Sequence, residues 1–525
     1  MNNLVKKLSL SLFSACLILS ACSSPNDSTT QDNKVKANFL NGFDKYLPGQ
    51  NNQDNFQWGV STAGHQSEGY DTTSIWHTWD ISGKTLDTNP KGVDFLNRYQ
   101  EDANLAKGLG ANGFRFSIEW SRIEPRKGYF DPKGIQFYRN LLNAIRSRGM
   151  TPVVTLVHFN YPQWVLNESK NGNKGIEDPQ FIDHFLKYTE FVVREFGNDI
   201  KYWVTFNEPN IWIPASYLTG GMPPGKKNPL SAVKAMWNLL KAHSKAYDLI
   251  HQLDLDAMVS SNVFYILPKP FGAISPAPDS NTIEAQNTNP VKIDDKNTLD
   301  TDWFYEAIST GNVSIDSQVF SNEKMQTKAV NYKSLKDELN ETDSRNKPKI
   351  NIELDSQVSW LKKFDYIAFD YYYRFRTIDH ILNLTRPWLI ELYPEGLYDA
   401  IMYYHRKYKK PIMIAENGIS TENLKPRTDK WTRESALVQH IKYMKKAMAD
   451  GANVIGYYHW SITDNYEWGT FTPRFGLYTV NALTDPSMKR IPTPAVEVYK
   501  QIISNNGLTD QLLAKYQAPT PRQER

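Results

Sequence analysis

Two glutamate residues close apolar runs that are typical of buried β-strands. Glu208 ends the run WVTFNE at 203–208, and Glu416 ends the run IMIAE at 412–416. A single acid after one apolar strand would carry little information about function. Two acids that each end an apolar run indicate a pair of carboxyl groups that works together.

A pair of carboxyl groups has the chemistry that retaining glycoside hydrolysis requires. One carboxylate attacks the anomeric carbon, while the other carboxyl protonates the leaving oxygen and later deprotonates water. The two groups need unlike surroundings, since one must be ionised while the other holds a proton. Retention requires a separation of about 5–5.5 Å, whereas an inverting pair stands about 6.5–9.5 Å apart. We expect the shorter separation for Glu208 and Glu416.

The elements that must position this pair are short apolar runs that alternate with longer helical segments. Eight candidate strands lie at 56–62, 113–118, 151–157, 201–206, 257–264, 365–371, 411–416 and 454–459. This alternation predicts βα units around a parallel sheet. Eight units favour an α/β fold of one domain, a (β/α)8 TIM barrel, although the same periodicity is compatible with a doubly wound sheet.

The segments between the strands have the period of amphipathic helices. Apolar positions in two of them recur at spacings of three and four residues: Leu96, Tyr99, Ala103 and Ala106, then Ile135, Tyr138, Leu142 and Ile145. Gly149 stands where a helix would end before the third strand. Two polar stretches, 268–302 and 321–360, do not fit simple units and are predicted to be long loops, with short elements in the second.

Polar and aromatic residues gather where the candidate strands end. In a barrel, those ends and the loops after them form the active face. His158 follows the third strand, Asn207 and Glu208 follow the fourth, Glu416 ends the seventh, and Trp460 follows the eighth. The predicted fold therefore brings both glutamates to one face.

Several runs along the chain resemble glycoside hydrolase family 1. The run TFNEP at 205–209 is similar to the acid/base motif of that family, and AENG at 415–418 is similar to its nucleophile motif, where Thr more often precedes the Glu. Supporting runs are FQWG at 56–59, QSEG at 66–69, RYQED at 98–102, RFSIEWSRI at 115–123, YPEGL at 393–397, GYYHWS at 456–461, DNYEW at 464–468 and RFGL at 474–477. The resemblance covers about residues 54–505.

The resemblance implies a role for each matched residue. Glu208 is expected to be the acid/base and Glu416 the nucleophile, with Asn207 on the sugar 2-hydroxyl. Arg115 and Tyr372 are expected beside Glu416, where a nearby cation keeps a carboxylate ionised. Trp460 is expected to be the stacking floor for the non-reducing sugar. The outer hydroxyls of that sugar are expected to be bound by Gln66, His158, Glu467 and Trp468.

Most of these residues also have an ordinary structural interpretation. Taken singly, His158, Trp460 and Trp468 are more often packing residues than ligands. Arg115 could be a buried ion-pair partner, and Glu467 could cap a loop. Only their places within the matched runs favour the functional interpretation.

The chain departs from the family pattern at two positions. Phe159 stands where the family usually has Trp, and Asp370 begins a run in which the family has Asn-Tyr-Tyr. An extra acid near the nucleophile would raise the pKa of Glu416 unless Asp370 is paired or points away. Glu467 is an acid that phosphoglycosidases of the family lack, so a free sugar 6-hydroxyl is expected to be preferred over a 6-phosphate.

Composition excludes several other functions. The 525 residues carry a net charge of +3, and Lys and Arg are not clustered, so no nucleic acid partner is expected. The only cysteines are Cys16 and Cys22, which leaves the folded body without a disulfide or a thiolate metal site. We expect a small-molecule glycoside or oligosaccharide substrate and neither a metal nor an organic cofactor.

The N-terminus has the pattern of a targeting segment. Lys6 and Lys7 precede an apolar run at 8–19 that is too short to span a bilayer. The run LSAC at 19–22 resembles the lipobox of bacterial lipoproteins, which implies cleavage before Cys22 and a lipid on that residue. The alternative is an ordinary signal peptide with an incidental cysteine.

The predicted organisation follows from these observations. Residues 1–21 are a lipoprotein signal peptide, 22–53 a polar tether, 54–505 the (β/α)8 hydrolase domain and 506–525 a polar C-terminal tail. We expect a protein anchored in the bacterial cell envelope, outside the cytoplasm, on the periplasmic face or the cell surface. The oligomeric state is not determined by the sequence.

The predicted activity is hydrolysis of a terminal β-linked sugar by double displacement through a glycosyl-enzyme intermediate. Glucose, galactose, fucose and related β-glycosides all remain open. One alternative is a catalytically silent barrel that binds sugars or docks a partner, but such proteins typically lack one of the two glutamates. The other is a transglycosylase that uses the same glutamates.

Overall fold

The computed structural model describes residues 56–168, 174–266, 303–310, 312–315, 350–353, 363–374 and 386–520. The predicted signal peptide, Cys22 and the tether lie outside these residues, as do 268–302 and most of 321–360.

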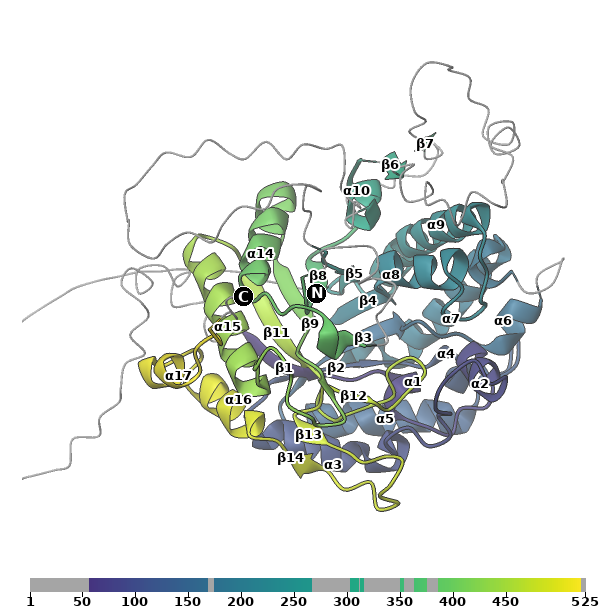
Figure 1. The fold of residues 1–525 in the computed structure, drawn as a ribbon. Helices are drawn as coiled ribbons and strands as arrows, with labels where there is room; N and C mark the ends of the chain where they lie inside the picture. The colour runs from purple at the N-terminus through teal and green to yellow at the C-terminus, as the bar shows by residue number, and fades with distance from the viewer. Residues whose placement is uncertain are drawn as a thin grey trace, which may run out of the picture. The chain divides into compact units, whose positions relative to one another are not determined.

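Eight parallel strands close into a barrel (Figure 1). They are β1 (Gln57–Ser61), β2 (Gly113–Ser117), β3 (Thr151–Val157), β4 (Tyr202–Asn207), β5 (Met258–Phe264), β8 (Ile367–Tyr371), β9 (Ile412–Asn417) and β11 (Val454–Trp460). Their order around the barrel is β1-β11-β9-β8-β5-β4-β3-β2. The predicted (β/α)8 barrel is therefore confirmed, and the closed order excludes the doubly wound sheet.

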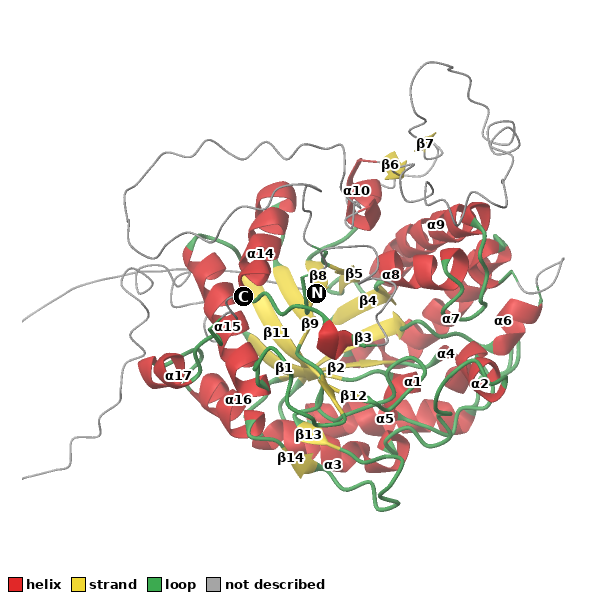
Figure 2. Cartoon of the chain, viewed as in Figure 1, coloured by secondary structure: helices red, strands yellow, loops and turns green. Residues whose placement is uncertain are grey.

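Helices surround the barrel and follow the strands in turn (Figure 2). They are α3 (Phe95–Gly108), α5 (Pro132–Arg146), α7 (Gln180–Phe196), α9 (Pro229–Leu253), α10 (Trp303–Thr310), α14 (Glu395–Tyr408), α15 (Arg433–Ala449) and α16 (Ala495–Ser504). Residues near both ends of helix α5 explain where the helix begins and ends. Asp131 caps it by accepting from the backbone N–H of Lys133, and Gly149, at φ +73°, adopts the left-handed conformation that separates it from β3.

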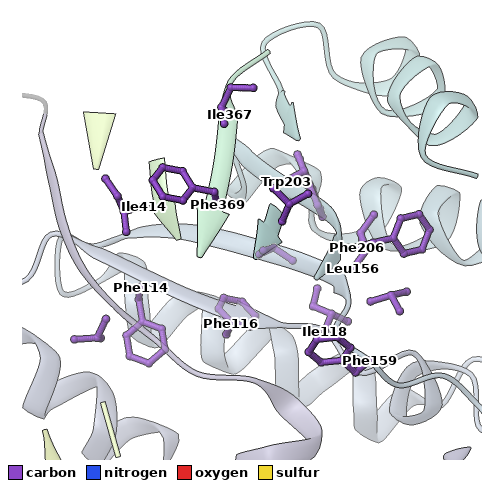
Figure 3. Packing of buried hydrophobic residues seen from close by; sticks show 14 of the residues in the cluster. Phe114, Phe116, Ile118, Leu156, Phe159, Trp203, Phe206, Ile367, Phe369 and Ile414 are labelled. Carbon is purple, nitrogen blue, oxygen red and sulfur yellow. The ribbon is translucent and has the colours of Figure 1, made fainter. Parts of the chain in front are cut away.

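Side-chain alternation along the strands separates the hydrophobic core from the site. In β2, Phe114 and Phe116 belong to the apolar cluster between the barrel and its helices (Figure 3). The residue between them, Arg115, points to the other side of the sheet and is buried there. The same cluster holds Trp203, Phe369 and other strand residues, so the barrel wall is held rigidly from outside.

Irregularities in strand register occur between several barrel strands, and two of them lie directly before Asn207 and Asp370. Between β4 and β5 the register shifts between Val204 and Asn207. Between β8 and β9 it shifts between Phe369 and Asp370. Such bulges re-aim the side chains that follow them and are frequent next to active sites.

The remaining elements are short. The helices are α1 (Gly64–Ser67), α2 (Ile75–Ile81), α4 (Trp120–Ile123), α6 (Gln163–Asn167), α8 (Pro209–Ile213) and α17 (Asp510–Lys515). The antiparallel strand pairs are β6 (Asn312–Ile315) with β7 (Ile350–Glu353), β10 (Thr421–Glu422) with β12 (Pro473–Arg474), and β13 (Tyr478–Thr479) with β14 (Ile491–Pro492). Strand β7 lies within the predicted 321–360 loop.

Part of the segment predicted as a polar tail is folded. Helix α17 lies within 506–525, and Leu508 and Leu512 are buried in the main core cluster. These two leucines give the segment an apolar side that its polar composition hides. Among the described residues, no helix combines the length and apolarity that a membrane crossing needs.

Candidate active site

The two glutamates meet at the carboxyl ends of their strands. Glu416 lies in β9, and Glu208 directly follows β4 with φ +38° and ψ 56°, in the left-handed region. Both side chains are buried. One oxygen of each carboxyl lies within 4.8 Å of one of the other. This close approach agrees with the separation of about 5–5.5 Å between carboxyl groups that retention requires.

Glu416 is held by two donors. Arg115 Nη1 donates to Oε1, forming a buried ion pair, and the Tyr372 hydroxyl donates to Oε2 at 2.6 Å. Burial raises the pKa of Glu416, whereas the charge of Arg115 and the hydrogen bond from Tyr372 lower it. These donors favour the ionised form, which is the form that a nucleophile needs.

Glu208 has the opposite surroundings. Burial raises its pKa well above the ordinary value, and the negative charge of Glu416 raises it further. Arg115 opposes this rise but bonds directly to Glu416, not to Glu208. Glu208 is therefore disposed to hold a proton while Glu416 is ionised, as an acid and nucleophile pair requires.

Asn207 lies at the end of β4, directly after the register shift. Its Oδ1 accepts from Arg115 Nη2 at 2.6 Å, so the guanidinium that binds Glu416 also fixes the orientation of this amide. The five residues expected around the reacting bond (Glu208, Glu416, Arg115, Tyr372 and Asn207) are thus all buried and brought together.

The residues expected to bind the sugar form a second, adjoining group. The amide of Gln66 lies 3.1 Å from His158 Nε2, and the His158 ring stacks on Trp460 with centroids 5.8 Å apart and planes at 10°. Trp468 stacks on His158 at the same centroid distance and 19°. Trp460 Nε1 donates to Glu467 at 3.2 Å. Burial raises the pKa of Glu467 to about 8.

The substitution at Phe159 is accommodated by packing. Its ring meets Trp468 edge-on, with centroids 4.8 Å apart and planes at 84°. Phe159 and Trp468 both have positive φ, at 57° and 46°. Such non-glycine conformations cost about 1–3 kcal/mol each and cluster at functional sites. Phe159 thus packs directly against Trp468, one of the residues expected to bind the sugar.

Asp370 does not point away from the two glutamates, because one oxygen of its carboxyl lies within 4.8 Å of an oxygen of each. Its Oδ2 accepts from the side-chain amide of Asn262, and its carboxyl is hydrogen-bonded to that of Glu208. Burial, and then the charges of Glu416 and Glu208, raise the pKa of Asp370 well above its usual range. The expected repulsion therefore acts mainly on Asp370 itself.

Asn262 is the residue of this site that sequence reasoning missed. It pairs with Asn207 in the barrel register and is fully buried. Arg115 Nη2 also approaches its Oδ1 at 3.4 Å. The available signal was a side-chain amide in strand β5, whose other residues are apolar or serine.

One acidic cluster among the described residues is spaced closely enough to hold a cation. It consists of Glu208, Asp370 and Glu416, whose oxygens lie within 4.8 Å of one another. Arg115 already supplies a positive charge to this cluster.

The fold and the site together define the class of protein. A closed (β/α)8 barrel carries two buried carboxyl groups of unlike surroundings at the ends of β4 and β9. This is the arrangement of a glycoside hydrolase. The profile of the family described as "Glycosyl hydrolase family 1" matches residues 50–508, and the chain belongs to that family. The expectation of a retaining β-glycosidase is confirmed at this level.

Three curated relatives are similar over nearly their whole length. The β-galactosidase of Pyrococcus woesei is 28% identical and the alignment covers 87% of this chain and 98% of the relative. The β-glucosidase A of Acetivibrio thermocellus is 29% identical, with 86% and 98% covered. The 6-phospho-β-galactosidase of Staphylococcus epidermidis is 30% identical, with 87% and 98% covered. These names show that neighbours of the chain act on different sugars.

Solved structures agree with the architecture. A β-glycosidase from Pyrococcus horikoshii is 27% identical and superimposes with a TM-score of 0.66. The superposition covers 90% of this chain and 98% of that chain. The barrel of the family is thus retained from end to end.

Proposed function

We propose that this enzyme removes terminal β-linked sugars from glycosides or short oligosaccharides, with Glu416 as nucleophile and Glu208 as acid/base. The observation that supports these roles most directly is the contrast between two neighbouring carboxyls. Glu416 receives hydrogen bonds from a guanidinium and a phenol, whereas burial and the charge of Glu416 keep a proton on Glu208.

The proposed reaction has two displacements. In the first, the Glu416 carboxylate bonds to the anomeric carbon while Glu208 gives its proton to the departing glycosidic oxygen. In the second, the Glu208 carboxylate takes a proton from water, whose oxygen attacks the same carbon and releases Glu416. Arg115 holds Glu416 and Asn207 in fixed relation, so the amide is oriented toward the sugar 2-hydroxyl. Two inversions leave the released sugar in the β configuration.

The proposed sugar site is the adjoining group around Trp460. The parallel rings of His158, Trp460 and Trp468 offer faces on which a pyranose can stack. Gln66 and Glu467 add polar groups for hydroxyls. Because Glu467 becomes an anion as its proton is lost, we expect plain glycosides to be better substrates than their 6-phosphates.

The sugar itself is best identified by a release assay across nitrophenyl β-glycosides. The relatives named β-galactosidase and β-glucosidase support gluco- and galactosides as the first candidates. A 6-phospho-β-galactoside belongs in the same panel because one relative is named for that substrate. Higher kcat/KM on the 6-phosphate than on the plain glycoside would contradict the proposed substrate class.

Variants of the two glutamates test the assigned roles. Glu416→Gly should abolish turnover. Glu208→Ala should lose most activity on substrates with poor leaving groups, because these need the proton. On a dinitrophenyl glycoside, Glu208→Ala should still form the glycosyl-enzyme intermediate, and azide should restore turnover with a β-azide product. Azide with Glu416→Gly should give the α-azide. Full activity in either variant, or an α-sugar as the first product of the unaltered enzyme, would refute the assignment.

Two alternatives lead to different measurements. A silent sugar-binding barrel is disfavoured by the presence of both glutamates, and any specific glycoside release excludes it. Transglycosylation uses the same residues, with a sugar hydroxyl in place of water. Product analysis with an added acceptor sugar separates transfer from hydrolysis.

We also propose that the protein is held at the bacterial cell envelope, outside the cytoplasm, by a lipid on Cys22. The sequence LSAC at 19–22 and the polar stretch after it support this. Labelling with a radioactive fatty acid should mark the unaltered protein and a Cys16→Ser control but not Cys22→Ser. Equal labelling of the Cys22→Ser variant would exclude the anchor.

A further inference from the structure

Asp370 occupies a position at which the family usually has asparagine, and it stands in the centre of the site. It lies in β8, paired in register with Phe264 of β5 on one side and Glu416 of β9 on the other. Its side chain is fully buried. The register shift between β8 and β9 falls directly before it, so its direction is set by the barrel.

The contacts of Asp370 leave one of its oxygens in need of a proton. Oδ2 accepts a hydrogen bond from the Asn262 amide, whereas no donor among the described residues serves Oδ1. Glu208 and Asp370 each place one carboxyl oxygen within 4.8 Å of the other, and a hydrogen bond between the two carboxyls lowers the pKa of Glu208 and raises that of Asp370. Two ionised carboxylates are both acceptors, so they can share a hydrogen bond only when one of them is protonated.

The charges around Asp370 also require a proton. Glu208 faces it from the residue after β4, Glu416 from β9 and Arg115 from β2, and Tyr372 lies directly after the end of β8. Arg115 supplies a positive charge to this cluster, and it is paired with Glu416. Full ionisation of all three carboxyls would bury a large excess of negative charge, which is strongly unfavourable.

We propose that Asp370 is a positioning residue that keeps a proton and donates it in a hydrogen bond to Glu208, so that the two carboxyls titrate as a pair. This inference rests on the proposed function of Glu208. In the first displacement the proton of Glu208 passes to the leaving oxygen, and the carboxylate that remains accepts the O–H of Asp370. In the second, Glu208 takes a proton from water. Asp370 begins and ends the cycle neutral.

The pair formed by Asp370 and Glu208 should give the pH profile of kcat/KM an unusual alkaline limb. Loss of the first proton leaves one proton shared between Asp370 and Glu208, so part of the acid form survives. Loss of the second proton creates three adjacent carboxylates and occurs at higher pH. The alkaline side of the kcat/KM profile should therefore contain two ionisations, at least about one pH unit apart.

The Asp370→Asn variant separates this pairing from a structural role. The amide has the same shape and can still donate to Glu208, but it cannot titrate. We expect the alkaline limb of this variant to show a single ionisation, below the second one of the unaltered enzyme. Asp131→Asn is the matched control, because Asn caps a helix as well as Asp does and Asp131 lies at the start of α5. Its pH profile should be unchanged.

Infrared spectroscopy tests the proton without depending on catalysis. At neutral pH, the difference spectrum between the unaltered enzyme and Asp370→Asn should contain the carbonyl band of one protonated carboxyl. In Glu208→Gln, the band assigned to Asp370 should persist. These spectra remain informative if Asp370→Asn folds poorly, since Glu208→Gln supplies the second measurement.

The outcomes are distinct. Identical alkaline limbs with and without Asp370, together with no loss of a protonated-carboxyl band, would overturn the proposal while leaving the glycosidase assignment intact. Activity that is lost in EDTA and restored by a divalent cation would show that a cation neutralises the cluster, and would also overturn it. Absence of glycoside release by the unaltered enzyme would instead refute the proposed function.

Discussion

The hydrogen bond from Tyr372 to Glu416 is the contact whose removal isolates the ionisation of the nucleophile. The Tyr372 hydroxyl donates to Oε2 at 2.6 Å within a buried site. Arg115 binds the other oxygen, so the ion pair remains when the phenol is lost. Tyr372→Phe therefore removes one donor from Glu416 and leaves the ring in place.

The magnitude follows from the kind of hydrogen bond. A hydrogen bond to a charged group contributes about 1.5–3 kcal/mol. One pKa unit corresponds to about 1.36 kcal/mol, so losing the bond should raise the pKa of Glu416 by about one to two units. The direction is upward because the bond favours the ionised carboxylate. The acid limb of kcat/KM should move to higher pH by the same amount.

The assay is the pH dependence of kcat/KM on a dinitrophenyl glycoside, whose departure needs little help from Glu208. Tyr371→Phe is the control, because its hydroxyl donates to the backbone carbonyl of Tyr393 at 2.5 Å and not to Glu416. Its acid limb should stay where it is in the unaltered enzyme. An unmoved acid limb in Tyr372→Phe, or an equal shift in both variants, would refute the reasoning.

Three further predictions concern the loop after β9, a buried ion pair of helix α3 and the sugar site. Gly418→Ala should lower kcat/KM about 10²-fold, because a Cβ there would stand 2.1 Å from the backbone oxygen of Trp460 and displace the residues beside the nucleophile; unchanged kinetics would contradict this. Asp102→Ala should reduce the free energy of unfolding by about 3–5 kcal/mol, since it leaves Arg490 buried without its partner; urea denaturation measures this, and kcat of the folded fraction should not change. Discrimination against 6-phosphorylated glycosides should increase as pH rises through about 8, where Glu467 becomes ionised; a constant ratio of kcat/KM values across that pH would exclude Glu467 as the cause.

The bounds of the barrel strands and of helix α5 could be predicted largely from the local pattern of apolar residues. The eight barrel strands begin and end within about two residues of the predicted bounds, because apolar runs and their flanking turns are encoded locally. Helix α5 likewise follows its apolar spacing, with Tyr138, Leu142 and Ile145 buried. The family resemblance then identified Glu208 and Glu416 at the ends of two of these strands.

Only the closed barrel decided how the residues of the site act on one another. Glu208, Asp370 and Glu416 come from three strands separated by long stretches of chain, and closure places their oxygens within 4.8 Å. Strand pattern gives the face on which a side chain lies, but the register shifts before Asn207 and Asp370 depend on neighbouring strands. Burial and mutual charge then raise the pKa of Asp370 and Glu208. The effects of burial and of mutual charge depend on the distances between the carboxyls and on the exclusion of water. Both conditions are set only when the tertiary structure forms.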